Sequence, residues 1–75
     1  MAWWVASKGS ELELVGRTEV SEGSAKSAAI AMSQSNPGMV IQVRYRVNAN
    51  ARTEVRWEAL DGALQEVTGE ARKHP

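Results

Sequence analysis

Apolar and polar residues alternate most regularly between residues 40 and 60. Two runs, over residues 40–47 and 52–60, place an apolar or aromatic side chain at every second position, and an Asn-rich segment joins them. Such runs around a turn-forming connector are typical of a β-hairpin. The predicted inner face carries Ile41, Val43, Tyr45, Val47, Thr53, Val55, Trp57 and Ala59, and the predicted outer face carries Gln42, Arg44, Arg46, Arg52, Glu54, Arg56 and Glu58.

Two connector lengths keep these faces consistent, because a slip of one residue would turn polar side chains into the core. A three-residue connector places Val43 opposite Val55 and suits a left-handed Asn50 before a bulge. A five-residue connector places Val43 opposite Trp57. Either connector also sets arginines opposite glutamates on the outer face.

The N-terminal third predicts a first hairpin. Residues 1–7 are rich in aromatic and β-branched side chains, which predicts a strand. Apolar and polar residues alternate over residues 11–15, which predicts a second strand that continues over residues 17–20 after Gly16. Successive strand residues point to opposite faces, so Trp3 and Trp4 cannot both lie under one covering layer.

A helical pattern follows over residues 24–35, with Ser24 or Ser21 as the N-cap and residues 36–38 as the stop. Its apolar stripe is nearly all alanine, which allows close approach to a sheet. Ile30 lies off the stripe, so either the helix is rotated to bury it or it is exposed for a partner. The stripe consists of Ala25, Ala28, Ala29 and Met32.

Asp61-Gly62 is a strong signal for a two-residue turn. We predict a return strand over residues 63–67 with Leu64 opposite Ala59, and a short helical turn is the alternative. Residues 69–75 contain no apolar side chain larger than alanine and predict a flexible tail.

These elements predict an α+β fold. We expect an antiparallel sheet of four to five strands in β-β-α-β-β(-β) order, with one helix packed on one face. Residues 1–68 form a single domain and residues 69–75 the tail. This layout recurs in small prokaryotic and phage proteins, but a layout alone does not define a function.

Composition indicates where the protein is expected to be located and whether it is expected to form oligomers. The 75 residues contain no cysteine and no apolar run long enough to span a membrane, so we expect a cytoplasmic protein that contacts no membrane. A chain this small without disulfides is marginally stable alone, which favours a homodimer or another oligomer.

Candidate chemistry is sparse. His74 is the only histidine and lies in the predicted tail, and no ligands are spaced for a metal. The serines lack a partner base, the glutamates alternate with apolar or basic neighbours, and no phosphate-binding glycine motif is present. We therefore predict no enzyme, no cofactor and no catalytic or metal-ligating residue.

The arginine-rich outer face and the tryptophan pair remain. A face of mixed charge is most often solvated, with cross-strand Arg–Glu pairs. It also suits a protein partner, and arginines beside an aromatic ring can bind single-stranded nucleic acid, although the net charge is zero. We expect a non-catalytic protein-interaction module, such as an adaptor, inhibitor or assembly subunit, that self-associates and uses this face and an exposed N-terminal tryptophan, with single-stranded nucleic-acid binding as the alternative. The candidate partner-binding residues are Trp3, Trp4, Gln42, Arg44, Arg46, Arg52 and Arg56.

Overall fold

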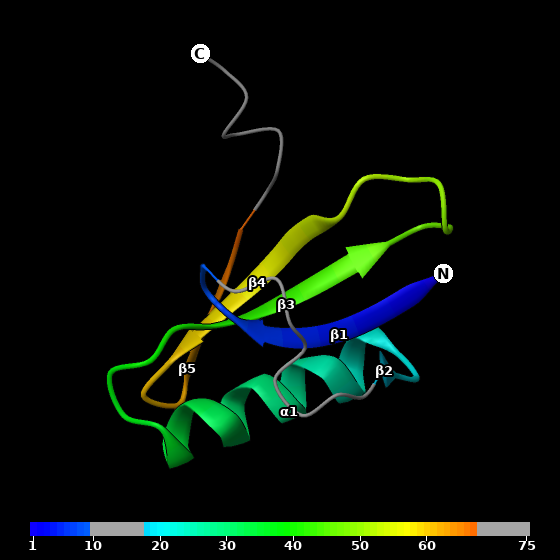
Figure 1. Ribbon diagram of the computed structural model, residues 1–75. Coiled ribbons are helices and arrows are strands. Elements are labelled where there is room, and N and C mark those ends of the chain that lie inside the picture. The colour runs from blue at the N-terminus through cyan, green and yellow to red at the C-terminus, as the bar shows by residue number, and fades with distance from the viewer. Residues whose placement is uncertain (10–17, 68–75) are drawn as a thin grey trace.

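The computed structural model describes residues 1–9 and 18–67. A five-stranded antiparallel sheet in the order β2-β1-β3-β4-β5 carries one helix on one face (Figure 1). The predicted α+β fold is confirmed, whereas the predicted strand over 11–15 and the tail over 69–75 lie outside the described residues. The elements are β1 (Ala2–Ser7), β2 (Thr18–Glu19), α1 (Glu22–Ser35), β3 (Ile41–Arg46), β4 (Glu54–Leu60) and β5 (Ala63–Glu66).

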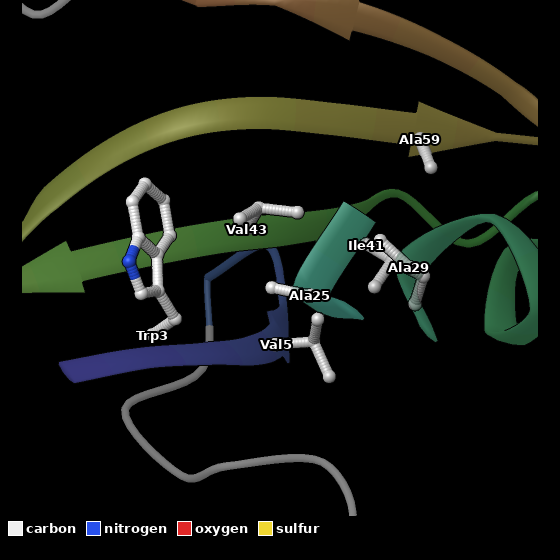
Figure 2. Packing of buried hydrophobic residues seen from close by; sticks show 7 residues of the cluster. All are labelled: Trp3, Val5, Ala25, Ala29, Ile41, Val43 and Ala59. Atoms are coloured by element: carbon white, nitrogen blue, oxygen red, sulfur yellow. The ribbon is translucent and has the colours of Figure 1, made fainter. Parts of the chain in front are cut away.

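The core lies between α1 and the central strands. Val5, Ile41 and Val43 are fully buried there, and each stabilises the fold by about 1.5–3 kcal/mol relative to exposure. Figure 2 shows that the helix contributes small side chains, Ala25 and Ala29, to the buried cluster that it forms with the strands. The helix is rotated from the predicted stripe and Ile30 is half-buried, so its buried positions are Ala25, Ala29 and Ser33.

The helix begins with a reciprocal capping box. The Ser21 hydroxyl accepts a hydrogen bond from the Ser24 backbone N–H at 3.1 Å, and the Ser24 hydroxyl lies 3.3 Å from the Ser21 backbone nitrogen. Two otherwise unpaired donors are thereby satisfied. Of the two predicted caps, Ser21 is the N-cap.

The turn predicted at Asp61-Gly62 is confirmed. Asp61 and Gly62 have φ values of 50° and 88°, and both are positive as a type I′ turn requires. Leu64 pairs with Ala59, so residues 63–66 form a strand rather than a helical turn. The Gly62 backbone N–H donates to the buried hydroxyl of Ser33 at 2.8 Å, which ties this turn to the helix.

β1 is not an edge strand. It pairs with β3 along its whole length, and Trp3 and Trp4 pair with β2 on its other side. At Trp3 and Trp4 both edges of β1 are therefore occupied by strands of the same chain. The edges of the described sheet are β2 and β5.

The β3–β4 ladder contains a register shift that the alternation did not predict. Val43 pairs with Trp57, as the longer connector requires, but the next residue, Arg44, pairs with Val55. Arg56 is left without a partner on β3, which is the arrangement of a β-bulge. The pair Tyr45–Glu54 beyond the bulge matches neither predicted connector, so both predicted lengths are wrong at the turn end of the hairpin. Among the described residues Asp61 is the only non-glycine with a positive φ, so Asn50 is not left-handed.

Candidate functional site: the outer sheet face

The bulge changes which side chains share a face. Beyond it Glu54 pairs with Tyr45, on the helix side, while Val55 pairs with Arg44, on the outer side. The guanidinium of Arg56 lies over the ring of Tyr45, 5.0 Å from its centroid, and bonds Glu54 at 3.3 Å. The predictions of an inward Val55 and an outward Glu54 and Arg56 are therefore wrong, because strict alternation fails at a bulge.

Six residues of the outer face surround a hollow of about 240 Å³. We call it the outer hollow. β1 supplies a tryptophan, and β3 supplies a glutamine and two arginines. The threonine comes just before β4, and the valine lies near the start of β4. The lining residues are Trp4, Gln42, Arg44, Arg46, Thr53 and Val55.

Gln42 fixes one of the arginines. Its side chain is 7% exposed, and its amide nitrogen donates to Glu58 at 2.8 Å. Its amide oxygen accepts from Nε and Nη2 of Arg44 at 3.0 and 2.9 Å. The amide is oriented by a carboxylate acceptor on one side and a cationic donor on the other, so Arg44 is held before any ligand binds.

Arg46 is held differently. Its Nη2 donates to the Thr53 hydroxyl at 2.7 Å, and its guanidinium carbon lies 5.6 Å from the centroid of the Trp4 ring. Its Nε is buried without a hydrogen-bond partner. Leaving a buried donor unpaired costs about 1–3 kcal/mol, and charged donors cost more. Arg46 is thus a cationic side chain whose donors are only partly satisfied.

The two arginines lack carboxylate partners. Within residues 1–9 and 18–67, Glu54 pairs with Arg56, and Glu58 lies 3.9 Å from Lys8, so no carboxylate pairs with Arg44 or Arg46. The expected cross-strand Arg–Glu pairs are not formed. The bulge places Glu54 on the helix side, and Gln42 lies between Glu58 and Arg44.

The structure brings together four of the seven predicted site residues, namely Trp4, Gln42, Arg44 and Arg46. Trp3 instead lies in the core, 7% exposed, with its ring centroid 4.5 Å from that of Tyr45. Arg56 lies on the helix side, and Arg52 is exposed in the β3–β4 connection.

Two lining residues were missed, Thr53 and Val55, because alternation assigned both to the inner face. No glycine marks the bulge in the sequence. The sequence signal for the bulge was only indirect: two connector lengths fitted the alternation of apolar and polar residues equally well, so the alternation did not determine how β3 and β4 pair.

A second hollow of about 410 Å³ lies towards β5, with a largely apolar lining. Leu60 is 43% exposed there, and Glu58 contributes to the lining of this hollow while bonding Gln42 of the outer hollow. Its lining residues are Val40, Glu58, Leu60, Ala63, Leu64 and Gln65.

No group of three or more His, Cys, Asp or Glu side chains within residues 1–9 and 18–67 could hold a metal ion. No helix in the same residues has the length and apolar character needed to cross a membrane. Comparison with protein-family models, curated proteins and solved structures finds no significant match to the chain.

Proposed function

We propose that this chain is a small non-catalytic protein-interaction module, acting as an adaptor, inhibitor or assembly subunit, that binds its partner through the outer hollow. The observation that carries the proposal is the pair Arg44 and Arg46, which lie beside Trp4 without a carboxylate partner in the described residues. Arginine and tryptophan are the residues most enriched among those that dominate binding energy at protein interfaces.

Preorganisation supports the same proposal. Gln42 holds Arg44, and Thr53 together with the Trp4 ring holds Arg46. Long side chains that are already ordered lose less conformational entropy when a partner binds.

The charged side chains around the outer hollow also favour a face that binds a partner over a face that contacts only solvent. Around the outer hollow Lys8, Arg44 and Arg46 outnumber one carboxylate, that of Glu58. A local positive field steers a negatively charged partner and fixes its orientation more than it adds affinity. Charge is therefore unevenly distributed over the part of the chain that the structure describes.

Single-stranded nucleic acid is the second candidate ligand. Trp4 beside two unpaired arginines is the combination of stacking surface and charge that such proteins use. Tyr45 and Trp57, however, belong to the helix side, where both pack against the core. That leaves one aromatic ring on the outer face, and Arg46 lies over it.

We also propose that the chain self-associates. Among the described residues the large apolar side chains that are fully buried are few, and a small cysteine-free chain gains stability from an oligomer. Sedimentation of the wild type and of Trp4→Ser tests whether the outer face takes part. A lower mass for the variant is expected, and a wild type that sediments as a monomer would refute self-association.

Site-specific photocrosslinking in cells of the source organism tests the main proposal. A photoreactive amino acid is placed at Thr53 beside the outer hollow, and at Ala31 on the exposed side of the helix as a control. We expect a discrete protein adduct from position 53 only, lost when Arg44→Gln and Arg46→Gln are added. Equal adducts from both positions, or none from position 53, would contradict the proposal.

A further inference from the structure

Arg44 and Arg46 keep hydrogen-bonding capacity directed at no protein group. Arg44 uses Nε and Nη2 on Gln42 and on the Ser7 carbonyl, and Arg46 uses Nη2 on Thr53. In the described residues neither Nη1 has a hydrogen bond, and Nε of Arg46 is buried without one. A guanidinium with free donors is suited to bind a carboxylate or a phosphate.

The spacing of the two arginines defines a ligand geometry. They are two residues apart on β3 and face the same side, so their Cα atoms are separated by about 6.6–6.8 Å. An extended peptide repeats with the same period, and its side chains at i and i+2 also share one face. Two acidic side chains at i and i+2 can therefore each meet one arginine.

From this we infer that the outer hollow binds an extended acidic segment of the partner protein, with carboxylates at alternate positions. The inference rests on the proposed function. One carboxylate bonds Arg44, which Gln42 already holds, and the next bonds Arg46 near the Trp4 ring.

Charge distribution favours an acidic peptide over a nucleic acid. Glu58 lies at the edge of the outer hollow, bonded to Gln42. Away from this face the described residues carry three basic and five acidic side chains, so the positive field is confined to the outer hollow and suits a short acidic segment better than a long polyanion. The acidic ones are Glu19, Glu22, Glu54, Asp61 and Glu66, and the basic ones are Lys26, Arg52 and Arg56.

Arg46 supplies a structural readout. A carboxylate bound to Arg46 draws the guanidinium towards the ligand, provides a partner for the unsatisfied donors and changes the contact with the Trp4 ring. The environments of Trp3 and Trp57, both on the helix side, stay unchanged. Fluorine NMR of the full chain labelled with 5-fluorotryptophan separates these three side chains.

The experiment titrates the labelled protein with short blocked peptides. One alternates Glu with Thr, a second has the same composition with its glutamates in one block, and a third replaces Glu by Gln. We expect the alternating peptide to shift the Trp4 signal and to bind about tenfold more tightly than the block peptide, as expected for one additional hydrogen bond to a charged group. The Gln peptide should not bind.

Matched variants locate the binding. Arg44→Gln and Arg46→Gln should each weaken binding of the alternating peptide about tenfold, whereas Arg52→Gln, the same change at an exposed arginine outside the hollow, should not. Unchanged Trp3 and Trp57 signals verify that the variants are folded.

The outcomes separate this inference from the proposed function. If neither acidic peptide binds while the position-53 adduct persists and depends on Arg44 and Arg46, the acidic-segment inference is wrong and the module remains. Equal binding of both acidic peptides would refute the alternating geometry. If oligo-dT binds more tightly than every peptide, with steep salt dependence, the ligand is nucleic acid and the inference fails.

Discussion

Gly62 gives a sharp test of how the β4–β5 turn is built. Its φ is +88°, and a Cβ at this position would lie 3.0 Å from Nε2 and 3.1 Å from Cγ of Gln34. Its backbone N–H donates to Ser33, so the chain cannot turn away without losing a hydrogen bond to a buried hydroxyl. The change Gly62→Ala should therefore destabilise the fold.

The size of the effect follows from the backbone. Holding an L-residue in the left-handed region costs about 1–2 kcal/mol. Gln34 is exposed and its side chain can move aside, so crowding adds little to this cost. In a domain of this size each kcal/mol lowers the melting temperature by about 4–8 °C, which predicts a fall of roughly 4–16 °C.

Thermal and urea unfolding followed by circular dichroism measure the change, with Gly23→Ala as the matched control. Gly23 lies in the first turn of α1, where an added Cβ meets only the Ser21 hydroxyl at 3.8 Å. The control should be neutral or stabilise by up to about 1 kcal/mol, because alanine loses less entropy than glycine in a helix. Gly62→Ala is repeated in a Gln34→Ala background, and full recovery there would refute backbone strain as the cause.

Three further changes test the helix and its contacts by shifts in the urea midpoint. Ser21→Ala should cost about 1 kcal/mol, because it removes the hydroxyl of the capping box, and an unchanged midpoint would contradict that cap. Ala29→Leu should cost about 1–3 kcal/mol by overpacking the helix–sheet contact, whereas Ala31→Leu on the exposed side should stay near the wild type. Trp57→Phe removes the 2.8 Å hydrogen bond from Nε1 to Glu22 and should cost about 1 kcal/mol, so a stability equal to the wild type would show that this bond contributes nothing.

Local rules were sufficient to predict much of this fold. A Ser before an alanine-rich run predicts a capped helix, and Asp61-Gly62 predicts a turn with two positive φ values, because few other residue pairs adopt that conformation. Alternation around an Asn-rich connector predicts the hairpin. Each of these features depends on residues close together in the sequence.

The composition of the outer face could not be predicted in the same way. It depends on one residue, Arg56, that has no partner on β3 in an otherwise regular ladder. Packing across the sheet decides which face Arg56 and its neighbours occupy. On the helix side Arg56 lies over two aromatic rings, those of Trp3 and Tyr45. Sequence alternation contains no information about that contact, and it therefore assigned Val55 to the wrong face.

Deletion of Arg56 tests whether the bulge sets the faces. The pairs Val43–Trp57 and Arg44–Val55 on either side of it become consecutive when Arg56 is removed, so the ladder becomes regular with every other residue on its present face. We expect the deletion variant to fold and to keep the Trp4 response to the alternating peptide. The lost contacts of Arg56 with aromatic rings are worth about 0.5–1 kcal/mol each, which predicts only a modest fall in stability.

A ladder without a bulge predicts the opposite result. Deletion would then shift every residue from Val55 towards the connector to the other face, move Thr53 away from Arg46 and abolish the hydrogen bond between them. Loss of the Trp4 response in a folded deletion variant would therefore refute the bulge, and with it the argument that the outer hollow is free of Glu54. Retention would show that one extra residue in β4 places Glu54 on the helix side and leaves the two arginines of β3 available to a partner.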